Sequence, residues 1–183
     1  MRTLTKEQQQ LMDWDNELRF ESAEYSDTKV CNIAKKACEF AFHNFKAKEE
    51  LYEDYQYEFE KKITNVALGI DSHLQENAKN KKSIVIKKFI LDIINEEKYL
   101  SGRSGFIFLL SVMKMDEELR QIASRKTKFW KTPRIEFQLL YSLYKRKIKG
   151  FKKQVENLIE DNPKERELIK YAKKYIEQEH KYK

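Results

Sequence analysis

The chain has 183 residues, of which 40% are hydrophobic and 37% charged, and it contains only four glycines and two prolines. That length and hydrophobic content suit one domain with a real core, and the scarcity of turn-forming residues argues against β-rich and loop-rich folds. We find no apolar run of about eighteen residues and no apolar signal core in the first ten residues, so we expect no membrane-spanning helix and a cytoplasmic location. The composition predicts an all-α protein, a compact bundle of six or seven helices.

In the N-terminal half, apolar residues recur at helical spacing. Thr5 and Gln8 have the spacing of a capping box and predict that a first helix starts at Thr5. Asp27 or Thr28 is expected to cap a second helix, whose apolar residues follow at intervals of three and four. A third apolar stripe covers residues 51–74 and predicts a long amphipathic helix.

In the C-terminal half, turn signals separate the helices more clearly. The segment 101–105, with two glycines and two serines, is the clearest turn. Residues 104–118 follow it and are apolar on nearly all sides at their start, so we expect a buried central helix there, with a buried strand as the alternative. Thr132-Pro133 and Asn162-Pro163 predict helix starts, and Gly150 is placed to end the helix between them.

Charge is distributed unevenly along the chain. Residues 1–60 contain 8 basic and 14 acidic side chains (net −6), residues 61–119 contain 10 and 8 (net +2), and residues 120–183 contain 19 and 8 (net +11). Twelve basic side chains lie between residues 120 and 153, where Glu136 is the only acidic one. Such an asymmetry indicates an acidic partner.

The same asymmetry suggests a division of the chain near residue 125. We expect an acidic to neutral helical bundle over residues 1–125 and a basic helical lobe over residues 126–183, packed on the first as parts of a single domain.

Candidate catalytic and metal-binding groups do not converge. On one helix Cys31 and Cys38 would share a face, but His43 would lie about 140° further round, so the three cannot hold one ion. We interpret the two cysteines as small buried side chains. Arg103 lies between two glycines whose N–H groups could present an anion site, although a plain helix–helix turn explains the segment as well. We therefore expect no enzyme activity, no metal and no cofactor.

The basic region is the strongest functional signal. Lysine and arginine neutralise phosphates, and exposed aromatic side chains stack on unpaired bases. The candidate residues for binding RNA, DNA or an acidic protein surface are Arg120, Arg125, Lys126, Lys128, Trp130, Lys131, Arg134, Lys145, Arg146 and Lys149. In the alternative interpretation, Phe129 and Trp130 are core residues and the lysines only keep the protein soluble.

Nucleic acid or a nucleoprotein complex is therefore the expected partner, and the expected function is that of a helical binding protein. The alternative is a protein-interaction module, such as an inhibitor or adaptor of phage or mobile-element type that acts on a nucleic-acid-processing enzyme. In that case the acidic, tyrosine-bearing segment 49–60 is a second candidate surface.

Overall fold

The computed structural model describes residues 4–45, 55–76, 79–125, 129–132 and 134–180. It is 84% helical, which confirms the all-α prediction, and over these residues it contains nine α-helices and no strand. The helices are α1 Lys6–Asn16, α2 Asp27–Asn44, α3 Glu58–Glu76, α4 Ile84–Asn95, α5 Ser104–Val112, α6 Asp116–Ser124, α7 Ile135–Arg146, α8 Lys152–Asp161 and α9 Arg166–His180.

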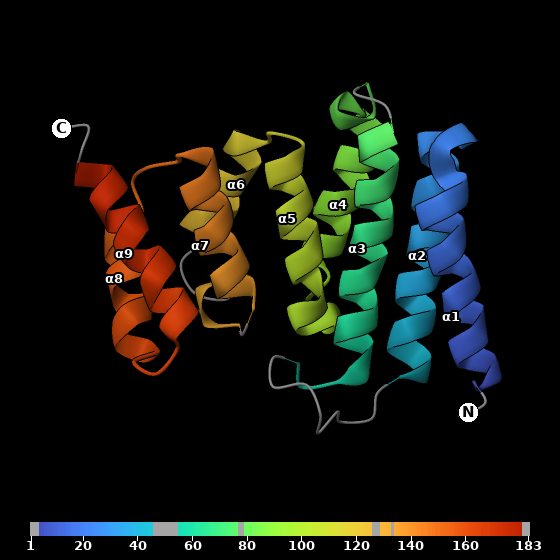
Figure 1. Ribbon diagram of the computed structural model, residues 1–183, viewed down its shortest axis with the longest axis horizontal. Coiled ribbons are helices and arrows are strands. Elements are labelled where there is room, and N and C mark those ends of the chain that lie inside the picture. Colours follow the sequence, from blue (N-terminus) through green and yellow to red (C-terminus); the bar gives the residue numbers. More distant parts are fainter. Residues whose placement is uncertain (1–3, 46–54, 77–78, 126–128, 133, 181–183) are drawn as a thin grey trace.

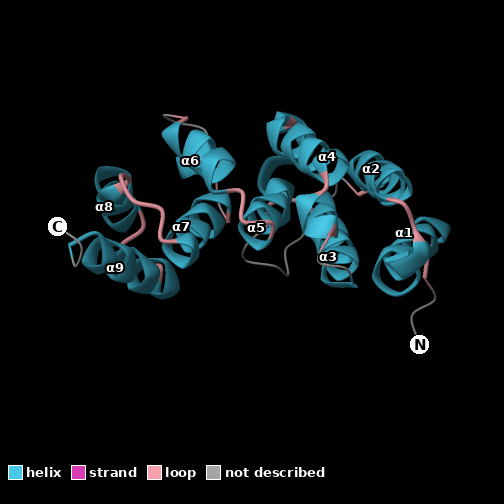
Figure 2. Cartoon of the chain, turned by 90° about the horizontal axis from the view of Figure 1, so that it is seen from above, coloured by secondary structure: helices cyan, strands magenta, loops and turns pink. Residues whose placement is uncertain are grey.

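These helices form an extended two-layer row rather than the expected compact bundle (Figure 1). Seen from above, α2, α4, α6 and α8 lie along one edge of the row, and α1, α3, α5, α7 and α9 lie along the other (Figure 2). Along the second edge each helix packs against the next, from α1 through α3, α5 and α7 to α9. The contact between α5 and α7 crosses the expected boundary at residue 125, so the basic part of the chain is packed directly on the rest.

The apolar segment after the glycine turn lies in the middle of the row, as α5. Phe106, Ile107, Leu109 and Leu110 are fully buried, and the strand alternative for this segment is wrong. Gly105 brings α5 against α3, because a Cβ atom at this position would lie 2.8 Å from the Cβ of Ala67.

The expected helix over residues 104–118 is in fact two helices. The chain leaves α5 after Val112, and Lys114 takes a left-handed conformation with φ of 59°. The backbone N–H of Met115 then donates to the carbonyl of Leu110, which closes the turn. Three acidic residues, Asp116 to Glu118, form the first turn of α6, where the positive end of the helix dipole stabilises them. The sequence pattern missed this break because no Gly or Pro marks it.

The starts of α1 and α2 agree closely with the sequence, whereas several other expected boundaries differ by two residues or more. Helix α3 starts at Glu58, α7 starts at Ile135 and ends at Arg146 before Gly150, and α9 starts at Arg166 because Asn162 ends α8. The capping box at Thr5 and Gln8 is confirmed, with N–H to side-chain oxygen distances of 3.2 and 3.0 Å. The cap of α2 is Ser26, one residue before the expected Asp27, and its hydroxyl accepts from the N–H of Lys29. Beyond the end of α1, the chain continues as a π-helical turn, Glu17–Glu21.

The two cysteines are free and buried, as expected. Burial raises the pKa of the Cys31 thiol to about 12, with a smaller contribution from Asp27. A thiol that remains protonated is a poor nucleophile, so Cys31 acts as a small packing side chain.

A buried histidine joins four segments at the C-terminal end of α3. His73 is 1% exposed, and its Nδ1 lies 2.9 Å from the carbonyl oxygen of Ser22, to which it donates. Its Nε2 lies 3.0 Å from a carboxylate oxygen of Asp27 in the first turn of α2. Asn80, in the turn before α4, donates to the backbone carbonyl of His73. This network fixes how the first three helices meet.

Candidate nucleic-acid interface

The predicted basic residues do not form one cluster. Arg125, Lys131 and Arg134 lie near the start of α7, whereas Arg120, Lys145, Arg146 and Lys149 lie near its end. Helix α7 has 12 residues, which makes it about 18 Å long. Lys126 and Lys128 lie outside the described residues.

Near the end of α7, two arginines form hydrogen bonds that connect neighbouring segments of the fold. Arg146 donates through Nε and Nη2 to both carboxylate oxygens of Asp116, at 2.6 and 2.9 Å. This bidentate pair raises the pKa of Arg146 and ties the end of α7 to the start of α6. Arg120 donates from Nη1 to the backbone carbonyl of Lys149 at 2.9 Å and so holds the α7–α8 turn.

The arginines near the start of α7 also have partners. Arg125 donates from Nη1 to the side-chain oxygen of Asn95, and its guanidinium lies 5.7 Å from the ring centroid of Phe129. The guanidinium of Arg134 lies 4.4 Å from the ring centroid of Tyr55. Lys131 is exposed.

Two aromatic residues proposed for stacking are part of the core. Trp130 is 7% exposed, and its indole N–H donates to the carbonyl of Ala123 at 2.8 Å. Phe129 is also buried, and the guanidinium of Arg103 lies 5.2 Å from its ring centroid. A buried ring has no face for a base, so Trp130 is removed from the candidate site. The core interpretation of both residues is the right one.

Arg103 is itself buried, and it caps a helix rather than binding an anion. Its Nη1 donates to the carbonyl of Ile94 in the last turn of α4, and its Nε donates to the carbonyl of Leu100. The simple-turn interpretation of its glycine-flanked segment therefore holds.

A different set of aromatic side chains lies on the surface between α7 and α9. Phe137, Tyr141 and Tyr144 project from α7 and surround Tyr171 of α9, and all four rings are half-buried. The ring centroid of Tyr171 lies 5.9 Å from that of Phe137, 5.1 Å from that of Tyr141 and 5.9 Å from that of Tyr144.

Three lysines lie over these rings. The ammonium of Lys145 is 5.4 Å from the ring centroid of Tyr141, and those of Lys170 and Lys174 are 5.7 and 5.4 Å from that of Tyr171. We call the seven residues the tyrosine–lysine face: Phe137, Tyr141, Tyr144, Lys145, Lys170, Tyr171 and Lys174.

The lysines of this face differ in how they are neutralised. Lys170 is paired with Glu167 at 3.1 Å, whereas Lys145 and Lys174 form no ion pair with any carboxylate that the structure describes. A cation–π contact at an exposed site is worth about 0.5–1 kcal/mol. The free energy lost when Lys145 or Lys174 leaves its ring to bind a phosphate is therefore small.

The sequence contains a signal for this face that is independent of its basic residues, namely the spacing of the aromatic residues on α7. Phe137, Tyr141 and Tyr144 are spaced by four and three, so they form a second stripe on α7 beside the buried one. Tyr171 lies 30 residues beyond Tyr141, and its contact with the stripe depends on the parallel packing of α7 and α9. No local pattern predicts that packing.

The single acidic residue of the basic region, Glu136, has a raised pKa. Burial raises the pKa of the Glu136 carboxyl to about 7, and repulsion from Asp161 and Glu165 adds to the effect, while a hydrogen bond from Asn162 opposes it. Near pH 7, Glu136 therefore cancels less of the surrounding positive charge than its residue type implies.

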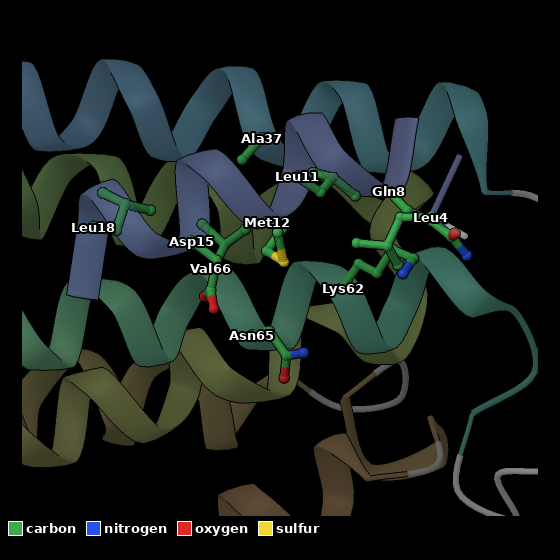
Figure 3. A pocket seen from close by; sticks show the side chains of 10 residues that line it. All are labelled: Leu4, Gln8, Leu11, Met12, Asp15, Leu18, Ala37, Lys62, Asn65 and Val66. Carbon is green, nitrogen blue, oxygen red and sulfur yellow. The ribbon is translucent and has the colours of Figure 1, made fainter. Parts of the chain in front are cut away.

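The N-terminal end of the row contains a partly open pocket of about 290 Å³ between α1, α2 and α3 (Figure 3). Its walls include Leu11, Met12 and Val66. Most polar groups at its rim are engaged elsewhere, since Asp15 pairs with Arg19 and Lys62 pairs with Glu58. The pocket therefore has a mixed apolar and polar lining and does not combine reactive groups.

Other functional signals are few. In the part of the chain that the structure describes, no three His, Cys, Asp or Glu residues are placed to hold a metal ion, and no helix is long and apolar enough to cross a membrane. Comparison of the chain with protein-family models, with curated proteins and with solved structures finds no match.

Proposed function

We propose that this protein is a nucleic-acid-binding protein that contacts the phosphate backbone through its basic C-terminal part, and that it acts as a binder rather than as an enzyme. The observation that carries the proposal is the tyrosine–lysine face, where Lys145 and Lys174 come together from two helices without an acidic partner among the described carboxylates. Ammonium groups without acidic partners release counterions when they meet phosphates, and this release drives binding regardless of sequence.

The extent of the basic surface favours a polymer over a small anion. Lys131 near the start of α7 and Lys145 near its end are separated by roughly the length of that helix, about 18 Å. Along the axis of a duplex, one strand presents a phosphate about every 3.4 Å, so a duplex lying along α7 would present about five phosphates of one strand over this distance. A small anion would contact one end of α7 only.

Charge reversal on the face tests the proposal. Binding of labelled single-stranded and double-stranded oligonucleotides is measured by fluorescence anisotropy at several salt concentrations, for wild type and for the double variant Lys145→Glu, Lys174→Glu. We expect the variant to bind more weakly at low salt. On a single strand, the slope of log affinity against log salt should flatten by about 0.7 for each phosphate that the variant no longer neutralises.

The matched control is the double variant Lys36→Glu, Lys88→Glu. These two lysines are exposed on α2 and α4, and neither forms an ion pair with a described carboxylate. The net charge changes equally in both variants, so a general charge effect would weaken both alike. Equal weakening, or no binding of wild type at low salt, would refute the proposal.

A second candidate function, a protein-interaction module, is supported by exposed apolar side chains in the other half of the chain. Phe20 in the π-helical turn is 77% exposed, and Ile84 at the start of α4 is 80% exposed. Exposed large apolar side chains are typical of protein-binding surfaces when they form a patch. A protein that is retained from host extract by wild type, but not by the variant Phe20→Ser, would favour this function.

A further inference from the structure

The tyrosine–lysine face combines positive charge with partly exposed aromatic rings. Phosphate binding needs only the ammonium groups, yet here they lie over two of the four half-buried aromatic rings. Elsewhere in the basic region the aromatic rings are covered, as the burial of Phe129 and Trp130 shows. Partly exposed rings beside lysines that pair with no described carboxylate therefore distinguish this surface from a general basic one.

The bases of a duplex are stacked on one another, and their faces are inaccessible to protein side chains. In a single strand the bases are free to stack on aromatic rings, and the adjacent phosphates need cations close to those rings. Lys145 lies beside the Tyr141 ring and Lys174 beside the Tyr171 ring, which places an ammonium group without a described acidic partner next to each candidate stacking ring. The two ring centroids lie 5.1 Å apart and the rings meet edge to face at 82°, so two differently oriented rings from different helices adjoin at this surface.

We propose that the tyrosine–lysine face binds single-stranded nucleic acid, with bases stacked on Tyr141 and Tyr171 and phosphates bound by Lys145 and Lys174. This inference rests on the proposed nucleic-acid-binding function and assigns its ligand class and contact residues. Every base has an aromatic face, so the preference for single strands carries little sequence specificity.

Three probes of equal length separate the contributions: an oligodeoxythymidine, an abasic strand with the same sugar–phosphate backbone, and a duplex. We expect wild type to bind the oligodeoxythymidine more tightly than either of the others. Loss of stacking costs about 5- to 150-fold in affinity per base. The variant Tyr171→Leu, which keeps an apolar side chain between α7 and α9, should lose an affinity of this order for oligodeoxythymidine and bind the abasic strand as wild type does.

Tyr25→Leu is the matched control, because Tyr25 is also half-buried beneath a lysine, with the ammonium of Lys29 3.2 Å from its ring centroid, but lies in the N-terminal half. Binding by this variant should be unchanged. If Tyr171→Leu does not fold, Tyr141→Leu gives the same test from the other helix.

The outcomes distinguish this inference from the function on which it rests. If wild type binds the abasic strand and the duplex as tightly as the oligodeoxythymidine, with steep salt dependence in each case, backbone binding stands and base stacking is wrong. Unchanged oligodeoxythymidine binding by a folded tyrosine variant would overturn the stacking assignment as well. If none of the three probes binds at low salt, the proposed function fails together with the inference.

Discussion

Replacing Glu136 by Gln should stabilise the protein at alkaline pH and leave its stability unchanged at acidic pH. The pKa of Glu136 is raised from 4.5 to about 7 by burial and by the neighbouring Asp161 and Glu165. Below pH 4.5 the carboxyl is protonated in both the folded and the unfolded chain, so it has no effect on stability. Between pH 4.5 and 7 only the unfolded chain loses the proton, and the folded state is progressively destabilised.

The size of the effect follows from the two pKa values. Each tenfold difference in proton affinity is worth about 1.4 kcal/mol, so the difference between 4.5 and about 7 sets an upper limit of about 3 kcal/mol above pH 7. Glu136 is only half-buried, so solvent screening should reduce the measured gain below this limit. For a chain of this size, each kcal/mol corresponds to a Tm change of about 2–4 °C.

Thermal unfolding of wild type and Glu136→Gln, followed by circular dichroism at pH 4 and pH 8, measures the effect. The control is Glu160→Gln on α8, where the side chain is exposed and the stability change should stay within about 0.5 kcal/mol at both pH values. Equal Tm values for wild type and Glu136→Gln at pH 8, or an equal gain at both pH values, would refute the electrostatic argument.

Three further changes test the packing and the basic region. Gly105→Ala should destabilise the fold by about 1–3 kcal/mol in chemical denaturation, because the new methyl group would lie 2.8 Å from a side-chain carbon of α3 and 3.0 Å from a backbone oxygen. His73→Leu should cost about 1–3 kcal/mol in the same assay, since it removes the imidazole hydrogen bonds to the Ser22 carbonyl and to the Asp27 carboxylate; a neutral result would mean that water replaces the ring. Reversing the three lysines of the segment before α7 (Lys126→Glu, Lys128→Glu, Lys131→Glu) should weaken oligonucleotide binding and flatten its salt dependence while cooperative melting is retained. Unchanged binding by that triple variant would show that these lysines only keep the protein soluble.

The sequence predicted the parts of this structure that depend on local chemistry. The capping box at Thr5, the burial of the cysteines and the buried segment after the 101–105 turn all follow from residue types and spacing. The break at Lys114 did not follow, because a lysine in a left-handed conformation is selected by the packing of α5 and α6 and not by its own preference. Local sequence patterns also could not predict how the helices are arranged in space, since the row depends on which helix faces pack against each other.

The candidate site shows the same limit at the level of single residues. Trp130 and Tyr141 are both aromatic side chains in a basic region, and hydrophobicity alone ranks the tryptophan as at least as good a stacking residue. The structure separates them because the short helical turn Phe129–Lys131 packs against α6 and α7 and covers the indole, whereas Tyr141 is directed towards α9 at the surface. Only the three-dimensional arrangement could decide between them.

Arginines and lysines of the basic region also have different roles, and this difference bears on specificity. Arg120 binds a backbone carbonyl, Arg125 binds an asparagine and Arg146 binds a carboxylate, so these planar guanidinium groups connect segments of the fold. Arginine is the side chain that reads guanine by paired hydrogen bonds, and a guanidinium held by a bidentate pair within the protein, as Arg146 is by Asp116, is not free for that task. Lys145 and Lys174, which form no ion pair with a described carboxylate, are flexible point charges suited to phosphates. An interface built from lysine and tyrosine should therefore hold a strand by its backbone and by the faces of its bases, with little regard to base identity.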